Sequence, residues 1–507
     1  MFNIVLDNDV ILSLLSQSIN DTQRCYTRVQ KSPTIRFWIP CCLLPLLETQ
    51  IFPVHHHPLE TLLKNENVQL LSSLAAHWEK IPPNHPNKIQ ALISLDASAL
   101  PGTTLIWTNH PDFISVCPEI EFGDHETIYA MLAQEEEDVK FHDLTTQQLY
   151  LRASLEKEIF NILKQEEYIF GSPTQKLELR LAKEVGSKHC ITLANSTDAL
   201  LIALMAVGVK EGNEVITSPF NSPIIAEMIT LLGAKPVFVD IDSRTYNLNP
   251  LLLRTSITRK TKAIIPSNLY GQCADFDVIN MIAAEHNLPV IEDATQSFGA
   301  RYKDRQSGNL AMIGYTSFLP THPLGTYGDG GACFTNDDKL AETIKSLRSS
   351  DYQGKATYRS VGLNSCLGNL QTAILLSKLS TFRKELEQRT KIGNLYTRLF
   401  KEQPQIKFPI ITPYNSTIYS QYVIEIEHRN KVQEKLQQKG IPTEVSYSSP
   451  IHLQPAFAHL EKGVGNFPIA EVTSKRILSL PMHSYLNEER ITHIVGVVKW
   501  AISTSSS

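Results

Sequence analysis

An alternation of short apolar stretches and helical segments between residues 186 and 345 constrains the fold of this chain more than any other feature. Strand-like stretches occur at 189–193, 214–217, 236–240, 262–266 and 288–292. Helix-like segments between them occur at 198–209, 223–232 and 278–286. Such alternation indicates an α/β fold whose sheet is mostly parallel and covered on both faces. Because ligands of these sheets bind beyond the carboxyl ends of the strands, the residues that follow each strand are candidates for a functional site.

Charge is unevenly distributed along the 507 residues. Residues 1–139 contain 7 Lys and Arg against 17 Asp and Glu, whereas residues 140–507 contain 40 against 35. The acidic run Glu135–Asp138 is typical of a solvated linker, and we place that linker at residues 134–140. An acidic domain at 1–133 would therefore precede a larger body. Its negative surface would repel phosphate backbones, so we expect no nucleic-acid partner.

The cysteines and the apolar runs indicate in which compartment the protein is expected. The eight cysteines are scattered and form no CxxC pattern, so neither a metal site nor a disulfide framework is indicated. No apolar run reaches the roughly 18 residues that a membrane helix needs. The N-terminus carries early acids instead of the basic region that opens a signal peptide. We therefore expect a cytoplasmic protein with reduced thiols and no membrane partner.

Small hydroxyl and acidic residues follow the expected strands. Ser196 and Thr197 open a long helix, where exposed N–H groups and the helix dipole favour a phosphate, although both residue types also serve as ordinary helix caps. Asp293 follows another strand, where a carboxylate can pair with a protonated ring nitrogen or belong to a simple turn. Farther on, Ser317 precedes a glycine-rich stretch that ends at Gly331, and clustered glycines permit close approach of the backbone. The combination is more specific than any of its parts.

These motifs identify a family resemblance. Residues 141–500 resemble the DegT/DnrJ/EryC1/StrS family of nucleotide-sugar aminotransferases, most of all the branch that aminates a 3-keto UDP-N-acetylglucuronic acid for O-antigen polysaccharides. The agreement runs through residues 168–171, 195–200, 233–240, 269–275, 291–293, 327–331, 361–364 and 480–483. The resemblance implies the type I fold of transferases that depend on pyridoxal 5′-phosphate (PLP). We expect its large mixed-sheet domain at 141–380 and its small α/β subdomain at 381–507.

The resemblance also implies roles for individual residues. Three hydroxyl residues would hold the PLP phosphate, namely Ser196, Thr197 and Ser317. Asp293 would face the pyridine nitrogen and Gln296 would contact the ring hydroxyl. Asn364 would reach the phosphate in a partner subunit, because sites of this family lie at a homodimer interface. Two positions would contact the nucleotide sugar, those of Tyr447 and His452.

One departure from the family pattern concerns the Schiff-base lysine, whose position is taken by His322. Imidazole has no primary amine, so the covalent link to PLP cannot form and ordinary transamination should be lost or severely reduced. PLP or pyridoxamine 5′-phosphate (PMP) would then bind only non-covalently. Ser222 stands where the family has an aromatic residue that stacks on the cofactor, and residues 364–368 lack the family's Arg and Asp. Several losses around one pocket favour an impaired enzyme or a regulatory pseudoenzyme.

An active enzyme is the alternative interpretation of the same substitution. One small branch of the family, the 3-dehydratases of 4-keto-6-deoxy sugars, has His in the lysine position and uses free PMP. His titrates near neutral pH and suits proton transfer, so His322 could act as the acid–base group of a dehydratase or aminotransferase.

The acidic domain at 1–133 resembles a PIN domain, a small α/β fold of metal-dependent ribonucleases. Asp7 and Glu48 match two of the carboxylates that such enzymes use for Mg²⁺. Gln90 and Asn109 stand where further acids are expected, which removes charge needed to hold the metal. The sequence therefore favours an interaction module over a ribonuclease, and Mg²⁺ would matter only if this domain were active.

Overall fold

The computed structural model describes five short strands near the N-terminus and, beyond them, residues 139–165, 167–349 and 361–505. The chain divides into two compact units, one made of residues 1–136 and 145–152, the other of residues 137–144 and 153–507. In the first unit the strands form a parallel sheet in the order β3-β2-β1-β4-β5. Their bounds are β1 Phe2–Leu6, β2 Ile35–Pro40, β3 Val68–Leu71, β4 Thr103–Trp107 and β5 Glu121–Gly123.

The PIN-like interpretation of the first domain is not supported by the structure. Asp7, Glu48, Gln90 and Asn109 all lie outside the described residues. The expected Mg²⁺ ligands therefore stay a prediction. Among the described residues, no group of His, Cys, Asp and Glu could hold a metal ion.

The second unit is built on a mixed sheet that confirms the expected α/β fold. Its strands are β6 His189–Leu193, β7 Glu214–Thr217, β8 Lys235–Phe238, β9 Thr261–Ile264, β10 Ile291–Asp293, β13 Ile313–Ser317 and β14 Gly331–Thr335. Parallel bridges at Ile264–Val290 and Ser267–Asp293 join β9 to β10. The strand order is therefore β8-β7-β9-β10-β13-β14-β6, and only β14 is antiparallel to its neighbours.

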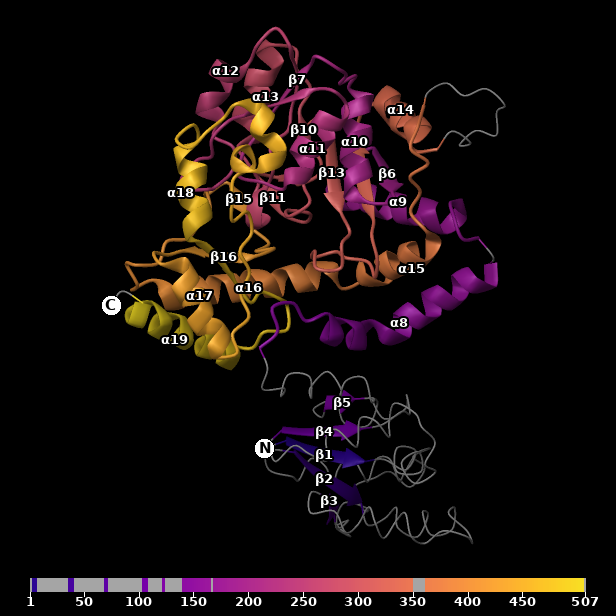
Figure 1. Ribbon diagram of the computed structural model, residues 1–507. Helices are drawn as coiled ribbons and strands as arrows, with labels where there is room; N and C mark the ends of the chain where they lie inside the picture. The colour runs from indigo at the N-terminus through magenta and orange to yellow at the C-terminus, as the bar shows by residue number, and fades with distance from the viewer. Residues whose placement is uncertain are drawn as a thin grey trace. The chain divides into compact units, whose positions relative to one another are not determined.

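Helices cover both faces of this sheet (Figure 1). They are α9 Gly171–Val185, α10 Ser196–Ala206, α11 Pro223–Leu231, α12 Leu253–Ser256, α13 Phe276–Glu285, α14 Asp338–Arg348 and α15 Asn369–Lys378, with the short turns η3 Pro250–Leu252 and η4 Leu269–Gly271. Successive strand residues point to opposite faces. Accordingly, Ile191 and Val215 pack in one buried cluster, whereas Cys190 and Ile216 pack in another.

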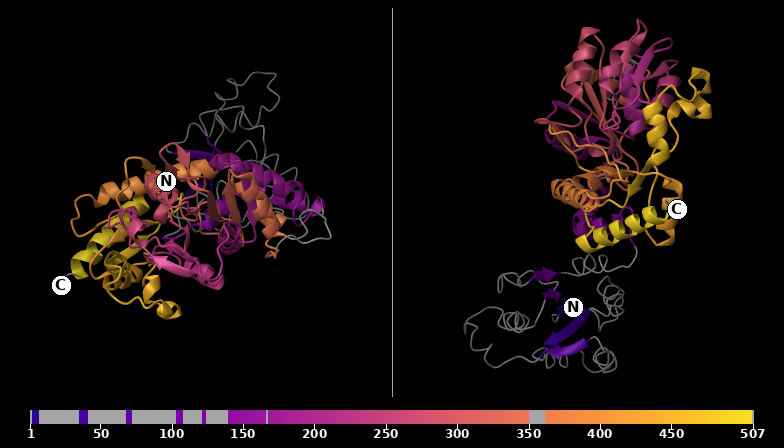
Figure 2. Two further views of the ribbon diagram at one scale, coloured as in Figure 1. Left: turned by 90° about the horizontal axis from the view of Figure 1, so that it is seen from above. Right: turned by 90° about the vertical axis from the view of Figure 1, so that its left-hand side faces the viewer.

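The small subdomain follows helix α16 Phe382–Phe400, which runs below the sheet in Figure 1. It contains the antiparallel pair β16 Tyr422–Glu425 and β17 Ile477–Leu480, helices α17 Arg429–Gln438, α18 Pro468–Arg476 and α19 Glu488–Ser505, and the turns η5 Ile451–Leu453 and η6 Pro455–Leu460. Helix α19 packs on α16 and α17, and Figure 2 shows these helices from two further sides. A small antiparallel sheet of β11 Arg301–Tyr302, β12 Arg305–Gln306 and β15 Asn415–Ser416 connects the subdomain to the large domain.

Helix α8 spans Leu144–Gln165. Within the described part of the chain, no helix has the length and apolar character needed to cross a membrane.

Candidate functional site

The strand register brings three expected phosphate-binding residues to one edge of the sheet. Gly331, the first residue of β14, pairs with Leu193 of β6 on one side and with Ser317 of β13 on the other. Helix α10 begins directly after this edge, at Ser196. Its N-cap is Asn195, whose Oδ1 accepts a hydrogen bond from the Asp198 N–H at 2.7 Å. Because Asn195 caps the helix, the hydroxyls of Ser196 and Thr197 are not needed for capping. The helix was expected to begin at residue 198, so its observed start at Ser196 is two residues earlier.

The backbone is packed too tightly at this edge for a side chain at position 331. A Cβ on Gly331 would lie 2.5 Å from the Asn195 carbonyl oxygen and 2.8 Å from the Ser196 nitrogen. Both are backbone atoms at the start of α10, so neither can move without displacing the helix. We expect Gly331→Ala to lower the free energy of unfolding by about 2 kcal/mol and to weaken phosphate binding. Urea unfolding and equilibrium dialysis with PLP measure the two effects.

Gly463→Ala is the matched control for this substitution. Gly463 is exposed, and an added Cβ would have no atom within 4 Å. The control should change stability by less than about 0.5 kcal/mol. Equal stability of the two variants would contradict the close packing at Gly331.

Asp293 ends β10 at the same edge and is buried. Its Oδ2 accepts a hydrogen bond from the Ser267 hydroxyl at 2.7 Å, and its Oδ1 accepts from the N–H and hydroxyl of Thr295 at 3.1 and 2.7 Å. The Asn221 amide in turn donates to the Ser267 hydroxyl. A carboxylate fixed in this way is suited to receive a cationic N–H from a bound ring.

His322 lies in the loop between β13 and β14. Its Nδ1 is 3.3 Å from the carbonyl oxygen of Ser317. Burial lowers the pKa of His322, and the nearby charges of Asp293 and Asp329 act in the opposite direction. A neutral imidazole whose Nδ1–H donates to this carbonyl leaves Nε2 as a proton acceptor.

Gln296 connects the sheet edge to two tyrosines. Its Oε1 accepts from the backbone N–H of Tyr270 at 2.9 Å, and its Nε2 donates to the Tyr447 hydroxyl at 2.6 Å. The Tyr447 ring packs edge-on against Phe220, with 5.5 Å between centroids. The structure therefore brings Gln296 and Tyr447 together, and their roles toward a cofactor and a sugar stay predictions.

Four tyrosines around this region have left-handed backbone conformations, which sequence reasoning missed. Their φ angles are 63° at Tyr246, 58° at Tyr270, 44° at Tyr419 and 60° at Tyr447. Bulky residues adopt this conformation at a cost of about 1–3 kcal/mol each, and such strain concentrates at functional sites. The pattern L-Y-G at 269–271 is the one local signal, because Gly271 shares the unusual turn with a φ of 96°.

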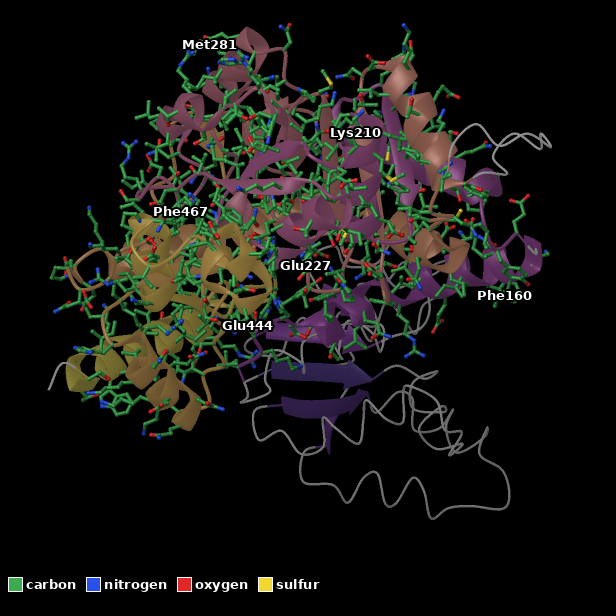
Figure 3. The ribbon with its side chains drawn as sticks, turned by 45° about the horizontal axis from the view of Figure 1, so that its top comes forward. Phe160, Lys210, Glu227, Met281, Glu444 and Phe467 are labelled. Atoms are coloured by element: carbon green, nitrogen blue, oxygen red, sulfur yellow. The ribbon has the colours of Figure 1, made fainter. Side chains whose placement is uncertain are left out.

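The other predicted residues differ in burial and in their contacts. The His452 side chain is buried, its Nε2 is 3.2 Å from the Glu471 carboxylate, and its ring packs against Phe467, which Figure 3 labels. Asn364 is exposed and has a φ of 50°. Ser222 precedes α11 and presents no aromatic face.

Three described lysines differ in their surroundings. Lys303 pairs with Asp277, and Lys339 is exposed on α14. Lys378 is buried with its Nζ 4.4 Å from the centroid of the Tyr327 ring. The described residues thus fit the phosphate and the ring nitrogen of a PLP-type cofactor.

Comparison with known proteins identifies the family and the fold. The profile of the DegT/DnrJ/EryC1/StrS aminotransferase family matches residues 150–499. The chain belongs to this family. It is 48% identical over 360 residues to the UDP-2-acetamido-2-deoxy-3-oxo-D-glucuronate aminotransferase of Pseudomonas aeruginosa, covering 71% of this chain and 99% of that protein.

Solved structures of family members agree with the architecture. A DegT DnrJ EryC1 StrS aminotransferase from Brucella abortus has a TM-score of 0.69 at 37% identity, covering 72% of this chain and 99% of that one. S. venezuelae DesV, solved with a ketimine intermediate, has a TM-score of 0.70 at 31% identity, covering 72% and 98%. The expected family and the expected PLP-dependent transferase fold are confirmed.

Proposed function

We propose that this family member binds PLP or PMP without a covalent link and is impaired in amine transfer to a nucleotide sugar. The observation that carries the proposal is His322, whose imidazole lies against Ser317 at the edge where Asp293 and the start of α10 converge. The name of the P. aeruginosa relative supports a UDP-linked 3-keto sugar acid as the substrate class. Amine transfer to a nucleotide sugar of this class is a step of sugar and polysaccharide biosynthesis.

Individual residues have distinct tasks in this proposal. Ser196, Thr197 and Ser317 hold the cofactor phosphate with the N–H groups that open α10. Asp293 holds the ring nitrogen, and Gln296 reaches the ring hydroxyl while Tyr447 fixes its amide. The bound cofactor supplies an electron sink for proton removal next to nitrogen. His322 can hold or move a proton at its Nε2, a task that the lysine amine performs in other members of the family.

We further propose that the chain forms a homodimer. Ile169 pairs with Gly368 in an isolated bridge, and the adjoining Tyr168, Ile169 and Leu370 are 51%, 60% and 42% exposed. Exposed apolar side chains that cluster in this way mark interaction surfaces. Asn364 lies four residues before Gly368 and is exposed, as a residue that reaches a partner's phosphate must be.

Replacing His322 with lysine tests the proposal. We expect His322→Lys to retain PLP on the chain after borohydride reduction, whereas the wild type releases all of it on denaturation. Amine transfer to the UDP-linked 3-keto sugar acid should stay about 100-fold below that of the P. aeruginosa relative, because Ser222 cannot stack on the ring and position it. Intact-mass measurement and product chromatography provide the two readouts.

His459→Lys is the control, because His459 is exposed on η6. It should gain no stoichiometric adduct. Transfer by the wild type at the rate of the relative would refute the impairment. Conversion of a keto sugar by the wild type with PMP, lost in His322→Asn, would favour the active His-based enzyme instead.

A further inference from the structure

Strand β6 ends next to the start of α10, and helices α9 and α14 lie beside it (Figure 1). The Glu178 Oε1 on α9 accepts hydrogen bonds from the N–H and the hydroxyl of Thr192, both at 2.9 Å. The Arg348 Nη1 on α14 donates to the same Glu178 oxygen at 2.7 Å and to the Thr192 carbonyl at 3.1 Å. Because the Arg348 side chain is buried, this ion pair is little screened by salt, and it fixes the end of β6.

A segment from far along the chain also holds this end of the strand. Residues 361–365 run beside the end of α14, and the Ser365 N–H donates to the Arg348 carbonyl at 2.7 Å. The Ser365 hydroxyl oxygen in turn accepts a hydrogen bond from the Ala194 N–H at 3.0 Å. Ser365 is only 1% exposed, so water has little access to this bond. The hydroxyl therefore ties the first residue after β6 to α14.

Ala194 lies at the junction between β6 and the expected phosphate site. Asn195, the next residue, accepts the N–H groups of residues 198 and 199 with its side chain and its carbonyl. The N–H groups of Ser196 and Thr197 precede these bonds, so a phosphate can receive them. Hydrogen bonds of this kind form only within about 2.7–3.2 Å. A small shift of the junction would therefore lower the affinity for a phosphate.

We infer that Ser365 is a positioning residue for the cofactor phosphate, because its hydroxyl fixes Ala194 and with it the start of α10. The inference rests on the proposed function and adds a residue that does not itself touch the cofactor. It also gives two neighbouring residues different tasks. Asn364 is predicted to reach the phosphate in a partner subunit, whereas Ser365 acts on the phosphate site of its own chain.

Two ligands that differ only in the phosphate test this inference on the full-length protein. PMP and pyridoxamine share the same ring and carry no aldehyde, so neither forms a covalent link with a lysine. Ser365→Ala removes the acceptor of the Ala194 N–H. In equilibrium dialysis, we expect this variant to bind PMP about 10-fold more weakly than the wild type does, and the affinity for pyridoxamine to change by less than about twofold. A general defect of the fold would weaken both ligands alike.

Ser365→Thr and Ser365→Val form a matched pair, because their side chains have the same shape and differ only in the hydroxyl. We expect Ser365→Thr to keep the wild-type ratio of the two dissociation constants and Ser365→Val to lose it, whatever the added methyl group costs in stability. Ser416→Ala is the control elsewhere in the fold, because the Ser416 hydroxyl accepts the Arg301 N–H at 2.9 Å between β15 and β11. It should leave both affinities unchanged.

The outcomes separate this inference from the proposed function. A PMP dissociation constant that moves less than about threefold in Ser365→Ala would overturn the inference and leave the proposed function intact. Equal weakening of PMP and pyridoxamine would do the same. A wild type that binds PMP no more tightly than pyridoxamine would refute the phosphate site of the proposed function and this inference together.

Discussion

Replacing Asp293 with asparagine is expected to weaken PLP binding at least about 100-fold, because the substitution removes the buried charge that we propose pairs with the ring nitrogen. Asparagine preserves the shape of the side chain and can still accept from Ser267 or Thr295. The protein should therefore remain folded, and the loss should be specific to the cofactor. Equilibrium dialysis with PLP and with PMP, followed by fluorescence of the retained cofactor, measures the effect.

Asp304→Asn is the control for this change, since Asp304 is an exposed residue between β11 and β12. It should bind PLP like the wild type. A dissociation constant that moves less than about threefold in Asp293→Asn would mean that the carboxylate does not face the cofactor.

The largest loss of stability is expected from Glu292→Leu, about 3–5 kcal/mol. Glu292 is fully buried beside Asp293. Its Oε1 accepts from Asn268, Ser307 and the Gly308 N–H, and its Oε2 accepts from the Leu310 N–H, at 2.8 to 2.9 Å. Leucine would leave the Gly308 and Leu310 N–H groups buried without an acceptor, while Asn268 keeps its contact with the Ser307 hydroxyl and Ser307 its contact with Ser297. Urea unfolding followed by circular dichroism measures the change.

Titration of Glu292 gives this destabilisation a characteristic pH dependence. Burial raises the pKa of Glu292 from 4.5 to about 7, although its four donors act in the opposite direction. A raised pKa means that the folded state holds the proton more tightly than the unfolded chain. The stabilisation that the Glu292 carboxyl group provides is therefore complete below about pH 4.5 and is lost as the pH rises through about 7. The free energy of unfolding falls over this range by on the order of 3 kcal/mol.

The difference in stability between wild type and Glu292→Leu should accordingly be larger at pH 5 than at pH 8. Glu342→Leu on α14 is the control, because Glu342 is exposed and pairs with Lys345. It should cost less than about 1 kcal/mol at either pH. A Glu292→Leu difference that does not vary with pH would contradict the raised pKa.

Much of the large domain could be predicted from the sequence, because its signals are local. The strands at 189–193 and 214–217 have the predicted bounds, since short apolar runs between polar turns can be recognised without the rest of the fold. The start of α10 was missed by two residues. The Asn195 side chain competes with Ser196 and Thr197 as the cap, and the three residue types give similar signals.

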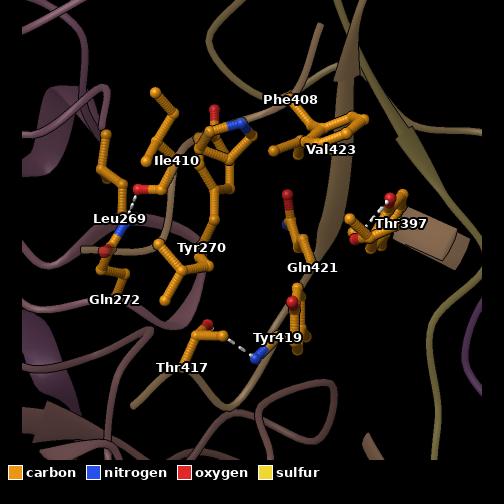
Figure 4. A pocket seen from close by; sticks show the side chains of 13 residues that line it. Leu269, Tyr270, Gln272, Thr397, Phe408, Ile410, Thr417, Tyr419, Gln421 and Val423 are labelled. Carbon is orange, nitrogen blue, oxygen red and sulfur yellow. Dashed lines mark hydrogen bonds between the residues drawn. The ribbon is translucent and has the colours of Figure 1, made fainter. Parts of the chain in front are cut away.

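Other features depend on contacts between distant parts of the chain. The Glu292 donors come from residues 268 and 307–310, and the pairing of His452 with Glu471 forms across the small subdomain. Similarly, the left-handed Tyr270 and Tyr419 and the cavity that they line (Figure 4) arise where the large domain meets the segment 408–423. No pattern within a few residues of these positions carries that information. The expected roles of four residues toward the cofactor phosphate stay predictions, those of Ser196, Thr197, Ser317 and Asn364.

The most direct test of the central claim is borohydride reduction of the full-length protein saturated with PLP, followed by intact-mass measurement and peptide mapping. We expect PLP to bind saturably in dialysis and to leave no stoichiometric adduct on the chain, because in our proposal His322 takes the position of the family's lysine. A stoichiometric adduct on a single lysine would contradict this account. It would show that the protein has replaced the missing amine from elsewhere in the fold.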